Sequence, residues 1–481
     1  MVFNSLSGRR LIVLITIASS CGFLLFGYDN GVFSGVIVLP WFLATFNRPD
    51  TKLLGTISAM YNVGGFLGGL LAFLLGSNLG RRRTILSGLS ITAVGAIVQC
   101  VAIKLGELIA GRILCGVDVG MLTSTVGLWQ AEVVQGRSRG MYLTLQALGG
   151  AAGGVFLAQW INYGFHKQPG RIAFAFPLAF QLVFVTISGV LVSVLPESPR
   201  WLVKQGRKSE ARTIEEAVDL EAGAGEGQLK QLISSGPTQN LRRLCLACGT
   251  MIMHQLNGVN TVTYYMPTLL MTFARASHDT SLWVTGLTSI SSMCFSLIPV
   301  LTIDRFGRRP FLWGGAVLQS LVLIIIAVLL ATAPPPADGG SHAFGVATVA
   351  MIFLYYCLTA AAWLGPSWAY PAEILPLQVR EKGLALGNVC YWLFQFMMVD
   401  ITPIALGNIG YKFYIILAVF NAVDAVIVYF CFPETKGLTL EEIDFQFAER
   451  HTGAIRKGQE LASVREKTDA AGTTVERLES A

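Results

Sequence analysis

Long uninterrupted runs of apolar residues are the feature that most constrains how this chain can fold. A stretch of about 20 apolar residues is long enough to cross the ~30 Å hydrocarbon core of a bilayer as a helix. Inside lipid a helix satisfies all of its own backbone polar groups, so runs of this length predict membrane-spanning helices. The sequence has twelve runs, at 11–37, 53–75, 84–103, 108–131, 142–163, 174–195, 244–272, 282–303, 311–332, 344–371, 383–407 and 411–432. We predict an all-α membrane protein with twelve transmembrane helices that contacts the lipid bilayer on all sides.

Composition supports this fold class and excludes others. Of the 481 residues, 53% are apolar and only 13% are charged, against roughly a quarter charged in soluble domains. The net charge of +6 is small for this length, and the nine cysteines lie mostly inside apolar runs. These values exclude a disordered chain, a disulfide-stapled secreted module and a nucleic-acid-binding protein. We expect no nucleic-acid partner, no metal and no cofactor.

The distribution of Lys and Arg predicts the orientation. If both termini are cytoplasmic, the cytoplasmic segments hold 27 of the 35 basic residues and the outer loops hold 7. Cytoplasmic loops of membrane proteins carry such an excess of basic residues. We expect a multi-pass protein with both termini in the cytoplasm, in the plasma membrane.

Three short patterns occur twice, in the same order. They follow the second, fourth and sixth apolar runs and recur after the eighth, tenth and twelfth, which indicates an internal duplication. We therefore predict two pseudo-symmetric six-helix halves at 1–195 and 244–432, a cytoplasmic linker with short helices at 196–243 and a cytoplasmic tail at 433–481. The recurring patterns are Gly80-Arg81-Arg82 with Gly307-Arg308-Arg309, Glu132 and Arg139 with Glu373 and Arg380, and Pro196-Glu197-Ser198 with Pro433-Glu434-Thr435.

Further motifs accompany the duplicated ones. They include Gly27-Tyr28-Asp29, Trp129-Gln130-Ala131-Glu132, Pro196-Glu197-Ser198-Pro199-Arg200, Asp304-Arg305-Phe306-Gly307-Arg308-Arg309 and Pro433-Glu434-Thr435-Lys436-Gly437. With these motifs the sequence resembles the sugar porter family of the major facilitator superfamily, in particular its fungal members, over nearly the whole chain. The resemblance implies a monomeric transporter, not an enzyme, that moves a small molecule by alternating access through a site between its halves.

Charged residues gather where the helices meet the predicted cytoplasmic face. Opposite charges there can pair between the halves when the inner mouth is closed, whereas the simpler interpretation is that they set topology and cap helices. We expect an inner gate that is weaker in the N-terminal half, because Ser77 and Asn78 stand where the family usually has Asp-Arg. The gate candidates are Glu132, Arg139, Glu197, Arg200, Asp304, Arg308, Glu373, Arg380 and Glu434.

Three charged residues fall inside apolar runs of the N-terminal half. Asp29 and Arg112 would each be costly alone in lipid, so we expect them to pair. A carboxylate that exchanges such a partner can carry a proton, and proton symporters of the family have an acid at the position of Asp29; the alternative is a static ion pair. Asp118 stands where the family usually has a small residue. It is either a second proton site or an acid buried against a neighbouring helix.

The resemblance also implies the substrate site. Amide side chains match the hydroxyl groups of a sugar, because each amide offers both donors and acceptors. Aromatic faces cover the apolar faces of the ring. The implied substrate-binding positions are Gln146, His254, Gln255, Asn260, Ser292, Trp368, Tyr391 and Trp392.

Three of these positions depart from the family pattern. His254 replaces a usual Gln, Ser292 a common Asn, and Tyr391 a usual Asn or Gln. A histidine, with an unperturbed pKa of about 6.5, adds a group that can contact an anionic solute, although a neutral imidazole in a helix contact is the alternative. The sequence therefore predicts proton-coupled transport of a sugar or sugar-like solute. It leaves open a facilitator or exporter of a non-sugar metabolite, such as a quinate-like acid or a natural product, and a non-transporting nutrient sensor.

Overall fold

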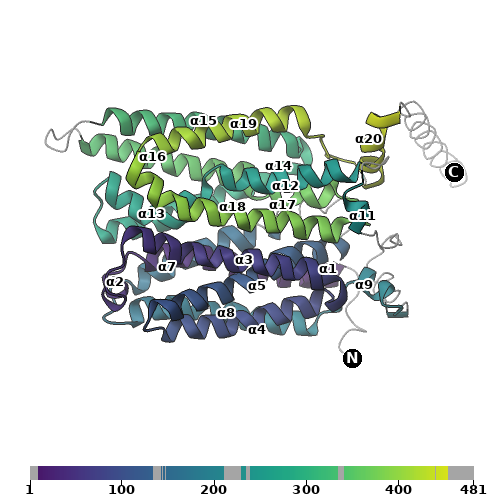
Figure 1. The fold of residues 1–481 in the computed structure, drawn as a ribbon, viewed down its shortest axis with the longest axis horizontal. Helices are drawn as coiled ribbons and strands as arrows, with labels where there is room; N and C mark the ends of the chain where they lie inside the picture. The colour runs from purple at the N-terminus through teal and green to yellow at the C-terminus, as the bar shows by residue number, and fades with distance from the viewer. Residues whose placement is uncertain are drawn as a thin grey trace, which may run out of the picture.

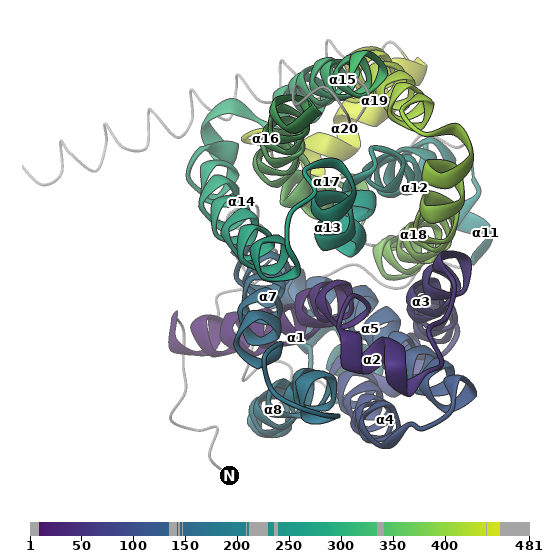
Figure 2. The ribbon, with the colours of Figure 1, turned by 90° about the vertical axis from the view of Figure 1, so that its left-hand side faces the viewer.

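The helices form two bundles that lie side by side. The structure is a computed structural model that describes residues 9–133, 142, 145–146, 148–207, 209–210, 229–234, 239–333, 341–376, 378–438 and 440–452. Every regular element in these residues is a helix. Figures 1 and 2 show the N-terminal helices in one bundle and the C-terminal helices in the other, with the long helices of both bundles running in the same general direction.

The N-terminal bundle contains six long segments. A π-helical turn, Leu148–Ala152, leads directly into α7. The helices are α1 (Arg9–Val36), α2 (Pro40–Thr45), α3 (Thr51–Leu79), α4 (Arg81–Val101), α5 (Leu105–Val133), α7 (Gly153–Phe165) and α8 (Ile172–Val194). All except the short α2 fall on predicted apolar runs.

The C-terminal bundle repeats this plan with two interrupted helices. The α12–α13 segment is broken at Asn257-Gly258, and a π-helical turn, Ala360–Leu364, joins α16 to α17. The helices are α12 (Asn240–Leu256), α13 (Val259–Phe273), α14 (His278–Phe306), α15 (Arg308–Thr332), α16 (Ser341–Thr359), α17 (Pro366–Ile374), α18 (Arg380–Ile409) and α19 (Lys412–Cys431).

Nine helical segments in the described residues are long and apolar enough to cross a membrane. The other three of the twelve predicted spans are α5, the π-helical turn with α7, and the broken α12–α13 segment. Each of the twelve predicted runs therefore carries a helical segment, and the predicted all-α class is confirmed.

Short helices mark one end of the molecule. These are α9 (Pro199–Lys204), α11 (Leu229–Leu232) and α20 (Leu440–Thr452), which Figure 1 shows on the right. Arg81 and Arg308 begin α4 and α15 at this same end. We call it the charged end, and the end that carries α2 the opposite end.

The duplication is visible in two equivalent turns at the charged end. Gly80 joins α3 to α4 with φ +86°, and Gly307 joins α14 to α15 with φ +96°. A side chain would be strained at these angles. It would also meet a carboxylate in both places, that of Glu197 at Gly80 and that of Glu434 at Gly307. The same residues therefore build the same turn in both halves.

Two helix pairs make the most extensive contacts between the bundles. Helix α3 packs along α18, and α7 packs along α14, as Figure 2 shows. Small residues allow the close approach, since Gly65 lies against the Trp392 ring and Gly286 against the Trp160 ring. The space between these two contacts contains the candidate site.

Candidate transport site

A cluster of aromatic rings fills the space between the two halves. Trp368 of α17 lies 5.4 Å from the Phe23 ring of α1 and 5.1 Å from the Tyr391 ring of α18, measured between ring centroids. Phe26 of α1 lies 5.6 Å from Trp392. The cluster thus combines predicted residues of the C-terminal half with two phenylalanines of the N-terminal half.

Polar atoms without partners occur at three of the predicted substrate-binding positions. Among the described residues, no hydrogen bond reaches the buried Gln146 Oε1, Gln255 Nε2 or Trp368 Nε1. The Asn260 amide donates to Gln255 Oε1. An unsatisfied buried polar atom costs about 1–3 kcal/mol, which a bound solute with hydroxyl groups would recover.

The structure places the other predicted positions less centrally. The His254 ring is 2% exposed and lies 5.8 Å from the Tyr391 ring. Its Nδ1 is 3.1 Å from the Ser367 hydroxyl, so the ring also makes a contact between helices. Ser292 is buried on α14 and lies near Tyr356.

Asp29 and Arg112 are both buried but do not form the direct ion pair predicted from the sequence. The Arg112 guanidinium lies 4.3 Å from the Phe33 ring and 4.6 Å from the Tyr61 ring, a cation–π arrangement. Its three nitrogens and Asp29 Oδ2 have no hydrogen-bond partner among the described residues.

The residue after Asp29 links the two halves, which the sequence analysis missed. Asn30 Oδ1 accepts a hydrogen bond of 2.6 Å from the Tyr264 hydroxyl of α13 and one of 2.9 Å from Gln395 Nε2 of α18. The sequence does contain a signal for this residue, because Asn30 is a polar amide directly next to the intramembrane acid Asp29. The acid of α1 and the contacts between the halves are thus one residue apart.

Asp118 faces α4. Its Oδ2 accepts a 2.7 Å hydrogen bond from the Thr92 hydroxyl, while Oδ1 lies against Gly88 and has no partner among the described residues. This contact corresponds to the second sequence interpretation, an acid buried against a neighbouring helix.

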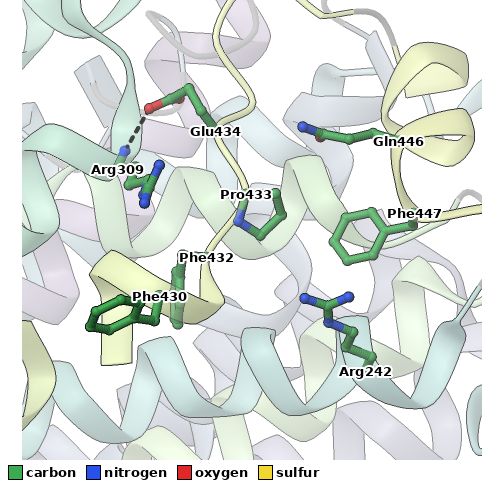
Figure 3. Close-up of a pocket in the computed structure, with 8 residues that line it drawn as sticks. All are labelled: Arg242, Arg309, Phe430, Phe432, Pro433, Glu434, Gln446 and Phe447. Atoms are coloured by element: carbon green, nitrogen blue, oxygen red, sulfur yellow. Dashed lines mark hydrogen bonds between the residues drawn. The ribbon is translucent and has the colours of Figure 1, made fainter. Parts of the chain in front are cut away.

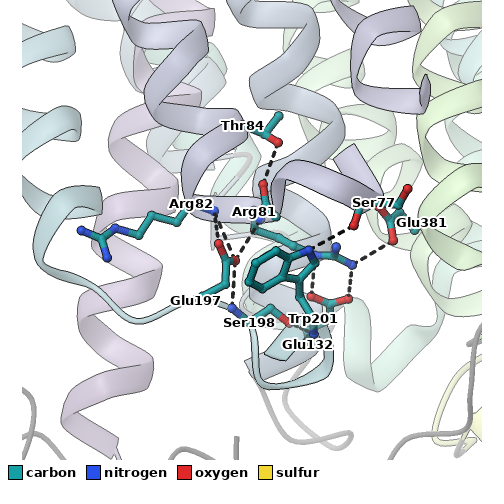
Figure 4. A network of polar contacts seen from close by, with 10 residues as sticks. Ser77, Arg81, Arg82, Thr84, Glu132, Glu197, Ser198, Trp201 and Glu381 are labelled. Carbon is teal, nitrogen blue, oxygen red and sulfur yellow. Dashed lines mark hydrogen bonds and ion pairs between the residues drawn. The ribbon is translucent and has the colours of Figure 1, made fainter. Parts of the chain in front are cut away.

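Each half has its own charged network at the charged end, and Figure 4 shows that of the N-terminal half. Arg81 binds Glu132 through two hydrogen bonds of 3.0 and 2.8 Å. Arg308 binds Glu373 at 2.6 Å and Asp304 at 3.0 Å. The sequence analysis expected the gate charges to pair between the halves, but these pairs lie within one half. The reason is that the helix ends of each half bring its own acids and bases together.

Two other predicted gate acids cap helices. Glu197 accepts the backbone N–H groups of the first turn of α4, at 2.9 Å from Arg81. Glu434 does the same for α15, at 2.9 Å from Arg308 and 3.0 Å from Arg309. A carboxylate at a helix N-terminus accepts hydrogen bonds from backbone N–H groups that have no partner within the helix, and it interacts favourably with the positive end of the helix dipole.

One ion pair joins the halves at the charged end in the described part of the chain. Arg81 Nη2 lies 3.1 Å from Glu381 Oε2 of α18, and Figure 4 shows both acids on the same guanidinium. The sequence analysis placed neither Arg81 nor Glu381 in the gate. Of the remaining predicted gate residues, Arg380 donates to the Leu375 carbonyl at 3.1 and 3.0 Å. Arg200 joins none of these pairs, and Arg139 lies outside the described residues.

The halves also meet at the opposite end. The Thr56 hydroxyl of α3 is 3.1 Å from Asp400 Oδ1 of α18. His166, which follows α7, is 2.9 Å from Asp279 of α14. Because both ends are joined, the central cluster is enclosed between them.

Two related helical halves that enclose a polar and aromatic cluster within a membrane define a secondary transporter of the major facilitator fold. The solved structure of the proton:xylose symporter XylE of E. coli, bound to 6-bromo-6-deoxy-D-glucose, has this fold with a TM-score of 0.78. The alignment covers 92% of this chain and 100% of that chain at 21% identity.

The chain belongs to the family described as Sugar (and other) transporter, whose model matches residues 14–447. It is similar to the MFS-type transporter oryC of Aspergillus oryzae, with 36% identity over 92% of this chain and 86% of the relative. It is also similar to the sugar transporter STL1 of Saccharomyces cerevisiae, with 31% identity over 93% and 83%. The chain is therefore a transporter of a small molecule and not an enzyme.

Proposed function

We propose that this protein is a proton-coupled symporter that moves a sugar-like cyclic solute by alternating access. The observation that carries the proposal is the enclosed cluster of aromatic rings and partnerless amide atoms beside a buried, unpaired acid and base. In this proposal the protein works as a monomer in the plasma membrane with both termini in the cytoplasm. The halves at 1–195 and 244–432 move against each other, joined by the linker at 196–243, with the tail at 433–481 on the cytoplasmic side.

The substrate part of the proposal rests on complementary chemistry. Gln146 and Gln255 each offer a free amide atom, and Trp368 offers a free N–H. The rings of Trp368, Trp392 and Tyr391 offer flat apolar surface. A solute that has a ring with both hydroxyl groups and C–H faces matches these groups. In this proposal Asn260 orients Gln255, and His254 and Ser292 line the site.

The proton part rests on Asp29. A buried carboxylate without a direct partner is costly when charged, so it favours proton uptake. A nearby cation favours the charged form of a carboxylate, and in this proposal Arg112 is that cation, so that Asp29 can exchange a proton. Asn30 transmits the change, because its carbonyl oxygen holds Tyr264 and Gln395 of the other half. In this proposal Asp118 has a structural role, because its hydrogen bond with Thr92 joins α5 to α4.

Alternating access requires contacts that break at one end at a time. At the charged end the contact is Arg81–Glu381, and at the opposite end the contacts are Thr56–Asp400 and His166–Asp279. Orientation follows from the excess of Lys and Arg at the charged end, which we assign to the cytoplasm. The pairs inside each half, including Glu132 and Glu373, keep each half rigid during the movement.

Uptake by the purified protein in proteoliposomes tests the proposal. The panel contains D-glucose, D-xylose, glycerol and quinate, each measured with and without an acidic exterior. We expect at least one cyclic solute to accumulate above equilibrium only with the pH gradient. Equilibration without accumulation would support a facilitator, and preferential uptake of quinate would support a non-sugar metabolite transporter. Solute binding without any flux would support a nutrient sensor.

A further inference from the structure

A cavity of about 250 Å³ lies at the charged end of the C-terminal half, apart from the central cluster (Figure 3). Arg242 of α12 and Arg309 of α15 line it from two sides, and Phe447 of α20 lies beside Arg242. The chain segment after α19 passes between them. None of the residues assigned to the substrate site lines this cavity.

Both arginines have donors to spare. A guanidinium carries five N–H donors. Arg242 uses one on Gln239 Oε1, at 3.1 Å, and its guanidinium lies 5.8 Å from the Phe447 ring. Arg309 donates to the Tyr429 carbonyl, while its buried Nε has no partner in the described part of the chain. No acid there forms an ion pair with either guanidinium.

The single acid in the lining is already engaged. Both carboxylate oxygens of Glu434 accept backbone N–H groups at the start of α15, those of Arg308 and Arg309. The positive end of the helix dipole compensates its charge. Among the described residues, no acid therefore neutralises the two arginines of the cavity, and an anionic ligand can do so.

The surroundings of the cavity indicate a lipid. Phe430 lines the cavity and is 72% exposed at the end of the membrane-spanning helix α19, next to Tyr429, which is 49% exposed. On α20, Phe447 is buried and Phe445 is 63% exposed. Aromatic side chains concentrate where the hydrocarbon core meets the headgroups. Basic pockets at this level bind the headgroups of anionic lipids.

We propose that this cavity binds the phosphate group of an anionic phospholipid, with Arg242 and Arg309 as its direct ligands. The planar guanidinium groups contact the phosphate oxygens through charge-assisted hydrogen bonds. The acyl chains lie on the exposed ring of Phe430. The bound lipid connects α12, α15 and the segment that leads to α20, so it stabilises the folded C-terminal half.

Lipid retention and thermal stability of the purified full-length protein test this inference, and neither depends on transport activity. We expect phosphatidic acid to remain bound in native mass spectrometry and to raise the melting temperature more than phosphatidylcholine. Arg242→Gln with Arg309→Gln should weaken the apparent affinity for phosphatidic acid by roughly tenfold for each arginine. Arg305→Gln is the matched control, because Arg305 is an exposed arginine at the end of α14, four residues before Arg309 and outside the cavity.

Three results would overturn the proposal. They are equal retention of phosphatidic acid by the double variant and the wild type, an equal loss in Arg305→Gln, and stabilisation by inorganic phosphate as large as that by phosphatidic acid. The last result would assign the site to a soluble phosphate. If the double variant does not fold, Arg242→Gln alone replaces it, since that side chain makes one hydrogen bond.

Discussion

The two copies of the duplicated motif differ at one position, and this difference changes which residue joins the two halves at the charged end. Asp304 lies four residues before Arg308 and binds it within the same half. The equivalent position before Arg81 is Ser77, and the second acid on Arg81 is Glu381 of the other half. The sequence shows that position 77 lacks an acid, but it does not show that Glu381 takes the place of that acid. Glu381 is 300 residues from Arg81 in the sequence, and only the packing of the two halves brings them together.

Glu381→Gln should therefore favour opening at the charged end. The pair is partly buried, with side chains 6% and 23% exposed, so we expect a loss of about 1 kcal/mol, or roughly fivefold in population. A cysteine introduced at Ser124, whose hydroxyl contacts Asn388 across the halves at 2.6 Å, reports the change through maleimide labelling. The background replaces the exposed Cys245, Cys294 and Cys431 by Ser. Asp304→Asn is the control, and equal labelling of both variants would mean that Glu381 does not hold the halves together.

His254 tests the polar part of the substrate site. An anionic solute bound next to the His254 imidazole would favour the protonated ring, so we expect the apparent affinity for quinate to increase as the pH falls. His254→Gln should remove this pH dependence and shift selectivity towards neutral hexoses, measured as competition for uptake over a pH series. Ser367→Ala keeps the imidazole but removes its hydroxyl partner, and should retain the pH dependence. An unchanged profile in His254→Gln would assign the ring to helix packing.

At the scale of single helices, the apolar runs predict where the membrane segments lie but not where they bend. The run at 244–272 reads as one helix, yet the chain breaks at Asn257-Gly258, where Gly258 adopts φ +96° and the Asn257 side chain accepts the N–H of Val259. The Asn-Gly pair is itself a turn signal in the sequence, but apolar runs alone do not register it because apolar residues flank the pair on both sides. The break places Asn260 so that it reaches Gln255.

Close packing of α5 against α3 gives a prediction for a single helix. A Cβ at Gly116 would overlap the Tyr61 carbonyl oxygen of α3, which is backbone and cannot turn aside, whereas nothing lies within 4 Å of a Cβ at Gly127 in the same helix. Gly116→Ala should cost about 1–3 kcal/mol of stability and lower the melting temperature in detergent. Gly127→Ala should not. Equal melting temperatures would mean that α3 and α5 adjust freely.

For the whole molecule, the sequence predicts the fold well and the site in part. Twelve apolar runs and the repeated motifs lead directly to the fold class, because each depends on local sequence. The resemblance also implies Trp368, Tyr391 and Trp392 as site positions, and the structure brings their rings together, with the His254 ring beside Tyr391. Contacts between the halves, such as those of Asn30 with Tyr264 and Gln395, depend on how the bundles are placed against each other. A single sequence does not specify that placement.

The central claim is that Asp29 couples proton movement to solute movement. The most direct measurement compares wild type and Asp29→Asn in the same proteoliposomes, with pH-driven accumulation and solute counterflow recorded side by side. Asn keeps the size of the side chain but cannot carry a proton, so we predict that accumulation is abolished while counterflow remains within a few-fold of wild type. Accumulation of solute against its gradient by Asp29→Asn, at the wild-type level, would contradict the account.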